Sequence, residues 1–78
     1  MTKVLFDRVC DVYDSENIET VAYSFNSKTM LIRFKTGAEY HYYSVNRETF
    51  FGIVCAESVG KAANAVVVSK LFPFERII

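Results

Sequence analysis

The most constraining feature of this sequence is the alternation of side chains on both sides of one glycine. Apolar and polar residues alternate through residues 29–35 and again through residues 39–43. A period of two is typical of β-strands that bury one face. Because a short loop containing Gly37 separates the two segments, the sequence predicts a β-hairpin.

The length of the hairpin loop decides which residues face each other. Opposite residues of an antiparallel pair share a face, so the apolar residues of both strands meet only across an odd-numbered loop. We therefore expect a three-residue loop over 35–37, with Gly37 in the left-handed conformation of a bulged turn. On the other face this register sets Arg33 opposite Glu39. The expected apolar pairs are Phe34 with Ala38, Ile32 with Tyr40, and Met30 with Tyr42.

Residues 18–25 predict a third strand, joined to the hairpin by a four-residue turn over 26–29. That turn places Val21, Tyr23 and Phe25 beside Phe34, Ile32 and Met30 respectively. The apolar face of this antiparallel meander is expected to hold Val21, Tyr23, Phe25, Met30, Ile32, Phe34, Tyr40 and Tyr42. The other face is expected to hold Thr20, Ala22, Ser24, Leu31, Arg33, Glu39, His41 and Tyr43.

Residues after the hairpin predict helices that cover the apolar face. Asn46 suits an N-cap, and Val45 and Phe50 occupy the positions of a hydrophobic staple. A break over 58–60 ends this helix, and we expect a second helix after it, although three β-branched residues at 66–68 leave a strand open there. The predicted fold class is α+β: an antiparallel meander of three or four strands with one or two C-terminal helices on one face.

The N-terminal residues leave two alternatives open. Residues 4–9 fit an edge strand, whereas a helical stripe would comprise Leu5, Val9 and Val12. We therefore divide the chain into an N-terminal extension over residues 1–14, either an extra strand or a helix, and a domain over residues 15–78.

Charge and composition exclude several classes of protein. A chain of 78 residues is one small domain, and nine basic residues balance nine acidic ones, so net charge gives no argument for a nucleic-acid or acidic-membrane partner. Cys10, Cys55 and the single His41 are too few for a metal site or a disulfide scaffold, which indicates a reducing cytoplasm. The apolar run 62–68 is too short to span a membrane, and we expect no signal peptide and no cofactor.

An ordered series of residues runs through most of the chain. It comprises Ile18, Tyr23, Thr29, Met30, Ile32, Phe34, Gly37, Tyr40, His41, Tyr42, Val45, Phe50, Ala56, Ser58, Gly60, Lys61 and Asn64. This series resembles the KTSC domain, a short module with a central Tyr-x-Tyr that occurs in small bacterial and phage proteins and at the C-terminus of some lysyl-tRNA synthetases. The Tyr-x-Tyr corresponds to Tyr40 and Tyr42, and a Ser-x-Gly-Lys step corresponds to Ser58, Gly60 and Lys61.

The resemblance implies a non-catalytic module, and the attachment to a tRNA enzyme implies RNA binding. The outer sheet face offers basic and planar groups for RNA; with Lys61, the expected contacts are Arg33, Lys35, His41, Tyr43 and Lys61. The alternative for that face is a solvated, charge-paired surface. We expect Tyr40 and Tyr42 to pack under the helices with their hydroxyls hydrogen-bonded at the rim.

Residues 58–61 have two interpretations. Backbone N–H groups entering a helix, a glycine and a lysine suit a phosphate, but the favoured interpretation is a turn in which Ser58 caps the second helix. A nuclease-like site on the outer face would need a second acid–base group beside His41, so we expect no catalytic site.

The C-terminal third is unusually apolar. Apolar surface left exposed there would suit a homo-oligomer or a protein target, as in a phage-type inhibitor of a host or defence factor. The expected interface residues are Val66, Val67, Leu71, Phe72 and Phe74.

Overall fold

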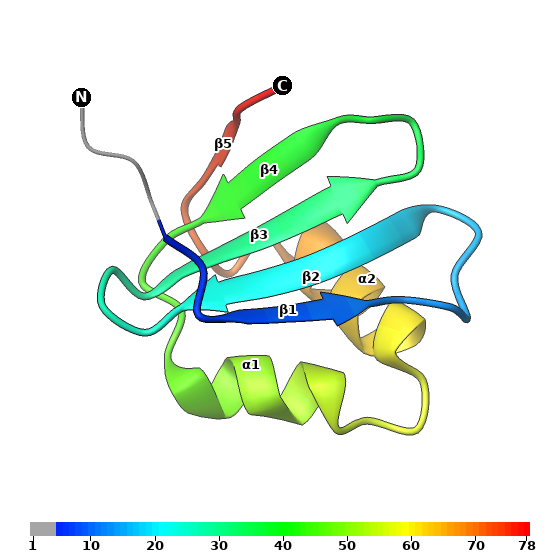
Figure 1. Cartoon of the computed structure of the whole chain (residues 1–78), viewed down its shortest axis with the longest axis horizontal. Coiled ribbons are helices and arrows are strands. Elements are labelled where there is room, and N and C mark those ends of the chain that lie inside the picture. The colour runs from blue at the N-terminus through cyan, green and yellow to red at the C-terminus, as the bar shows by residue number, and fades with distance from the viewer. Residues whose placement is uncertain (1–4) are drawn as a thin grey trace.

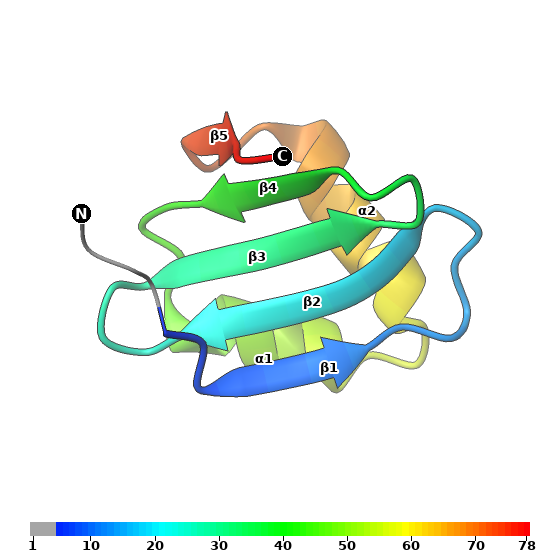
Figure 2. The same cartoon turned by 45° about the horizontal axis from the view of Figure 1, so that its top comes forward.

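A five-stranded antiparallel sheet with both helices on one of its faces forms the computed structural model, which describes residues 5–78 (Figure 1). The strands are β1 (Arg8–Asp11), β2 (Ile18–Ser24), β3 (Thr29–Phe34), β4 (Glu39–Tyr42) and β5 (Phe74–Arg76), and the helices are α1 (Arg47–Val54) and α2 (Val59–Ser69). The strands lie in sequence order, and Figure 2 shows both helices behind the sheet. The α+β class and the meander are confirmed, with one further strand at each edge.

The hairpin has the register that its alternation predicts. Gly37 has a φ of 97°, and its N–H donates to the Phe34 carbonyl over 2.9 Å. The Phe34 N–H donates in turn to the Ala38 carbonyl over 2.9 Å. The observed pairs are Met30 with Tyr42, Ile32 with Tyr40, and Arg33 with Glu39. Because the loop has three residues, the apolar side chains of both strands face the helices.

The register expected between β2 and β3 is wrong by two residues. Tyr23 lies opposite Met30 rather than Ile32. The chain turns earlier than expected, over residues 25–28, and Lys28 takes a positive φ of 54° to close the turn. Because the shift is an even number, every side chain keeps its expected face.

Both edge strands come from segments that the sequence left open or missed. Residues 8–11 form a strand, which favours the strand alternative there, while residues 1–4 of that segment lie outside the described residues. Residues 66–68 continue α2 and do not form a strand. The unexpected strand is β5, which adds to β4 by pairing Phe74 with Tyr42.

Tyr23 joins the sheet to the first helix. Its ring is buried and stacks on Phe50 with 4.9 Å between ring centroids. Its hydroxyl donates a hydrogen bond to the Val45 carbonyl, immediately before the Asn46 N-cap of α1. The core around this contact contains Val12, Ile18, Val21, Tyr23, Met30, Ile32, Tyr42, Val45, Phe50, Ile53 and Ala63.

The outer face of the sheet is less solvated than the sequence suggests. Ala22 and Leu31 are buried there, together with the small polar residues of β2. The Phe6 ring meets the His41 ring edge-on at 5.5 Å. Since Phe6 precedes β1 and His41 lies on β4, this aromatic contact spans the two strands between them and covers part of the face.

Substitution of Gly37 by alanine should lower the free energy of unfolding by about 1–2 kcal/mol, because a Cβ disfavours its positive φ. No heavy atom lies within 4 Å of the added Cβ, so the cost is conformational. Urea denaturation measures it. Gly52→Ala is the matched control: it lies in α1 with equally open space and should be neutral or stabilise by up to about 1 kcal/mol. Equal effects at the two positions would contradict this account.

Candidate functional site

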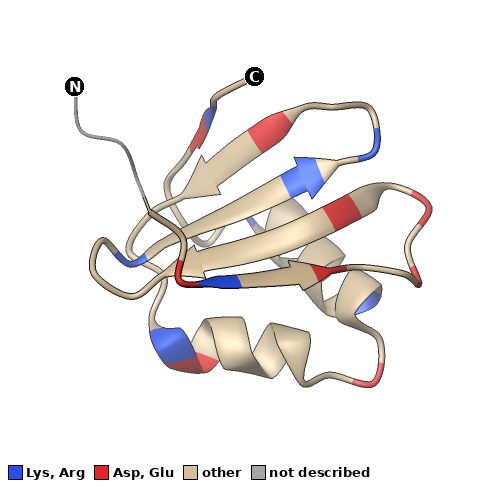
Figure 3. Cartoon of the chain, viewed as in Figure 1, with Lys and Arg blue, Asp and Glu red and all other residues tan. Residues whose placement is uncertain are grey.

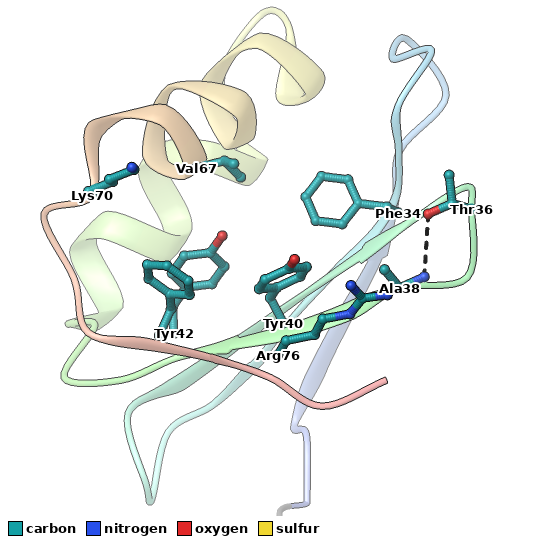
Figure 4. Close-up of a pocket in the computed structure, with 9 residues that line it drawn as sticks. Phe34, Thr36, Ala38, Tyr40, Tyr42, Val67, Lys70 and Arg76 are labelled. Atoms are coloured by element: carbon teal, nitrogen blue, oxygen red, sulfur yellow. Dashed lines mark hydrogen bonds between the residues drawn. The ribbon is translucent and has the colours of Figure 1, made fainter.

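A cavity of about 480 Å³ lies between the helix-facing side of β3–β5 and the C-terminal end of α2 (Figure 4). We call it the tyrosine pocket; it is lined by Phe34, Thr36, Ala38, Tyr40, Tyr42, Val67, Lys70, Phe74 and Arg76. Its volume falls in the range of about 300–1,000 Å³ that is typical of small-ligand sites. The pocket therefore brings the Tyr-x-Tyr pair into an accessible hollow.

Aromatic rings from three adjacent strands make the wall of the pocket. Tyr40 and Tyr42 alternate along β4, so both side chains point to the helix-facing side. Phe34 meets Tyr40 edge-on at 5.6 Å, and Phe74 lies 5.7 Å from Tyr42 between ring centroids. This arrangement offers ring edges and faces to a planar ligand.

The two tyrosine hydroxyls point from the sheet toward α2 (Figure 4). Tyr42 is only 3 % exposed, as expected for core packing. Neither hydroxyl has the hydrogen-bond partner that we expected, as far as residues 5–78 show. Burial raises the pKa of Tyr42, and the neighbouring Tyr40 adds to this effect. At neutral pH the Tyr42 hydroxyl is therefore protonated and free to donate or accept a hydrogen bond.

Two cationic side chains border the aromatic wall. Lys70 caps α2 in a left-handed conformation, and Arg76 extends from β5 at the edge of the sheet (Figure 4). The Arg76 Nε donates to the Ile78 carbonyl over 2.9 Å. Within the described residues, neither cation forms an ion pair with an acidic side chain. Sequence reasoning missed both, because Arg76 lies on the unpredicted three-residue β5 and Lys70 lies where α2 ends, and neither position has a periodic sequence signal.

The five residues expected to bind RNA do not converge on one surface. Arg33, His41 and Tyr43 lie on the outer face, Lys35 lies in the β3–β4 loop, and Lys61 lies on α2 at the other side of the sheet. Arg33 pairs with Glu39 over 2.7 Å, as the charge-paired alternative predicted. Figure 3 shows acidic and basic residues interspersed along the strands.

Acidic groups also surround the outer-face aromatics. The Tyr43 hydroxyl donates to the Glu75 carboxylate over 2.8 Å, which raises the pKa of Tyr43. Burial lowers the pKa of His41, and Glu39 and Glu75 partly offset this effect. His41 is therefore mainly neutral at pH 7. This face gives a phosphate little electrostatic attraction.

The Ser-x-Gly-Lys step joins the β1–β2 loop to the start of α2. One Asp14 carboxylate oxygen accepts from the Ser58 hydroxyl over 2.6 Å, and the other accepts from the Gly60 N–H over 3.0 Å. The Ser58 Oγ accepts from the Lys61 N–H over 3.2 Å, which confirms the capping interpretation. A Cβ on Gly60 would lie 2.8 Å from the Ser15 Cβ. The Asp14 carboxylate occupies the position that a phosphate would need. Residues 58–61 therefore connect the β1–β2 loop to α2 by hydrogen bonds within the domain.

The expected protein-interface residues divide into two groups. Val66, Val67 and Phe72 are partly buried against the core. Leu71 is 78 % exposed and Phe74 is 49 % exposed. Three further exposed apolar residues lie in the same C-terminal segment, and we call the whole set the C-terminal apolar patch: Val68, Leu71, Phe74, Ile77 and Ile78.

Residues 5–78 form a small α+β domain in which a meander sheet carries two helices on one face, and the sheet and the end of α2 line an aromatic pocket. Cys10 and Cys55 are free thiols. Within the same residues, no three His, Cys, Asp or Glu side chains gather as metal ligands, and no helix has the length and apolar character to cross a membrane.

Comparison with known proteins identifies the family of this domain. The KTSC domain model matches residues 14–72, and the chain belongs to that family. A protein of Tsukamurella paurometabola is 37 % identical over 54 residues, which cover 69 % of this chain and 81 % of that protein. The crystal structure of a KTSC domain protein from Yersinia pestis shares the fold, with a TM-score of 0.74 and 19 % identity over 91 % of this chain and all of that one.

The two hydrogen bonds accepted by the Asp14 carboxylate predict an acid-dependent loss of stability. The Ser58 hydroxyl and the Gly60 N–H hold the pKa of Asp14 below its usual value. The carboxylate therefore stabilises the fold above the ordinary aspartate pKa, and this contribution disappears as pH falls through the lowered value. Asp14→Asn should unfold at lower urea concentration than the wild type at pH 7, and the difference should shrink toward pH 2.

Asp11→Asn removes the same formal charge from an exposed residue of β1 and controls for net charge. A stability difference for Asp14→Asn that stays constant between pH 7 and pH 2 would contradict the role assigned to its carboxylate.

Proposed function

We propose that this chain is a non-catalytic module that binds single-stranded RNA and accepts one base in the tyrosine pocket. The observation that carries the proposal is the combination of an aromatic wall with two cations free of ion pairs among the described residues, Lys70 and Arg76. Proteins that bind single-stranded RNA combine stacking aromatics with positive side chains along the backbone path.

The arrangement assigns separate roles to the two kinds of side chain. Tyr40 and Phe74 are partly exposed and can stack on a base that enters the pocket. Lys70 approaches from the end of α2 and Arg76 from the sheet edge, so the cations suit the two phosphates that flank an inserted base (Figure 4). The attachment of related domains to a tRNA enzyme, implied by the family resemblance, points to the same ligand class.

Salt dependence follows from this small number of cations. Two phosphate contacts on a single strand give a slope of about −1.4 when the logarithm of the binding constant is plotted against the logarithm of salt concentration. We therefore expect moderate affinity, with stacking contributing much of the binding free energy.

Charge reversal at the pocket tests the proposal. Lys70→Glu/Arg76→Glu should weaken binding of a fluorescently labelled single-stranded RNA by tenfold or more at low salt and flatten the salt dependence, because two phosphate contacts become repulsive. Fluorescence anisotropy measures both effects. Lys61→Glu changes an exposed charge at the other end of α2 and should leave the affinity within about twofold.

Arg33→Glu/Lys35→Glu separates the pocket from the outer face. Loss of binding in this variant, with the pocket variant unaffected, would place the site on the outer face instead. Absence of wild-type binding at low salt would refute RNA as the ligand.

A second candidate function is self-association or protein binding through the C-terminal apolar patch. Leu71 and Ile78 expose most of their side-chain surface, and Ile77 is close to half exposed. Exposed apolar side chains mark interaction sites where they form a large enough surface. The patch adjoins the tyrosine pocket through Phe74, so the two sites share one side chain.

Leu71→Glu tests self-association. If the patch forms a homodimer, the wild type should sediment as a dimer at micromolar concentration and Leu71→Glu as a monomer, because the new carboxylate would be desolvated in the interface. Sedimentation velocity measures the difference. A wild type that is monomeric at these concentrations would exclude the homodimer. Val9→Glu changes an exposed valine at the opposite edge and is the matched control.

A further inference from the structure

We infer that the tyrosine pocket reads the hydrogen-bonding edge of a nucleobase through the Tyr42 hydroxyl, so that the pocket selects by polar contact as well as by stacking. This inference rests on the proposed function, since it names the feature of RNA that the pocket recognises. It makes Tyr42 a specificity-determining residue.

The state of Tyr42 is the first observation. The residue is 3 % exposed, and its hydroxyl makes no hydrogen bond within residues 5–78. No buried polar side-chain atom of these residues lacks a partner, so the Tyr42 oxygen reaches solvent. The oxygen is not sealed into the core; it lies at the pocket, where Figure 4 shows the hydroxyl directed toward α2. An accessible hydroxyl is hydrogen-bonded by solvent in the free protein. A base edge can replace that solvent partner, whereas an apolar ring that excludes the solvent leaves the hydroxyl unpaired, so the pocket should prefer the polar edge.

The surroundings of the hydroxyl are the second observation. The nearby walls of Val67, Phe34 and Ala38 contribute apolar side chains, and the Thr36 Oγ1 accepts from the Ala38 N–H. The remaining polar groups of the pocket are the two tyrosine hydroxyls and the two cations. Because the cations suit phosphates, the hydroxyls are the groups left to contact a base edge.

The protonation of Tyr42 fits this role. Burial raises its pKa, so the hydroxyl stays neutral at physiological pH. A neutral hydroxyl both donates and accepts, and it can pair with a carbonyl oxygen, a ring nitrogen or an amino group of a base. It cannot pair usefully with an apolar ring of the same shape.

A base isostere provides the test. One probe is a labelled uridine hexamer, and the other is the same hexamer with every uracil replaced by 2,4-difluorobenzene, which keeps the shape and has very weak hydrogen-bonding capacity. The wild type should bind the uridine hexamer about tenfold more tightly than the isostere hexamer. Tyr42→Phe should bind both with equal affinity, close to that of the wild type for the isostere.

Tyr43→Phe is the matched control, because it removes a hydroxyl that donates to Glu75 on the outer face. This variant should keep the tenfold preference. Thermal unfolding of all three proteins checks that they fold, and Tyr42→Phe should fold well since its lost hydroxyl has no partner among the described residues.

The outcomes separate this inference from the proposed function. Equal wild-type binding of both hexamers, at measurable affinity, would overturn base reading and leave the RNA module standing. A preference that persists in Tyr42→Phe would overturn the role of this hydroxyl. Absence of binding to either hexamer at low salt would refute the RNA function and the inference with it.

Discussion

The hydrogen bond from the Tyr23 hydroxyl to the Val45 carbonyl, with the stack of Tyr23 on Phe50, is the contact on which the two layers depend. A sheet with one apolar face must bury that face against another layer, so the helices must be held against it. Val45 is fixed at both ends, because its N–H also donates to the Lys28 carbonyl over 3.0 Å. The chain therefore enters α1 in one defined position relative to β2 and β3.

The alternation of apolar and polar residues correctly predicted the β3–β4 hairpin, whose register depends only on neighbouring residues. The alternation around Gly37 determines the hairpin register, since only an odd loop places Ile32 and Tyr40 on one face. The β2–β3 turn was misplaced because residues 25–29 contain no glycine to mark the left-handed position, which Lys28 takes instead. The three-residue β5 lacks a sequence signal of its own, and long-range pairing with β4 defines it.

The candidate site was predictable only in part, because it too depends on pairing between residues far apart in the sequence. Tyr40 and Tyr42 were singled out, and alternation correctly placed both on the helix-facing side of the sheet. Their pocket and its cations depend on β5 and on where α2 ends, and neither position follows from a periodic pattern. The basic residues expected to bind RNA do not form one surface, because Arg33 is paired with Glu39 across the hairpin and Lys61 lies on the other side of the sheet.

Strand β5, which forms one wall of the pocket, is the strand of the sheet that should open most readily. This strand has three residues, all exposed, and pairs with a neighbour on one side only, whereas β2 and β3 are mostly buried and paired on both sides. Brief fraying of such an edge costs much less free energy than global unfolding. Amide protons of β5 should therefore exchange with solvent well before those of β2, and a ligand that contacts Phe74 and Arg76 should slow their exchange.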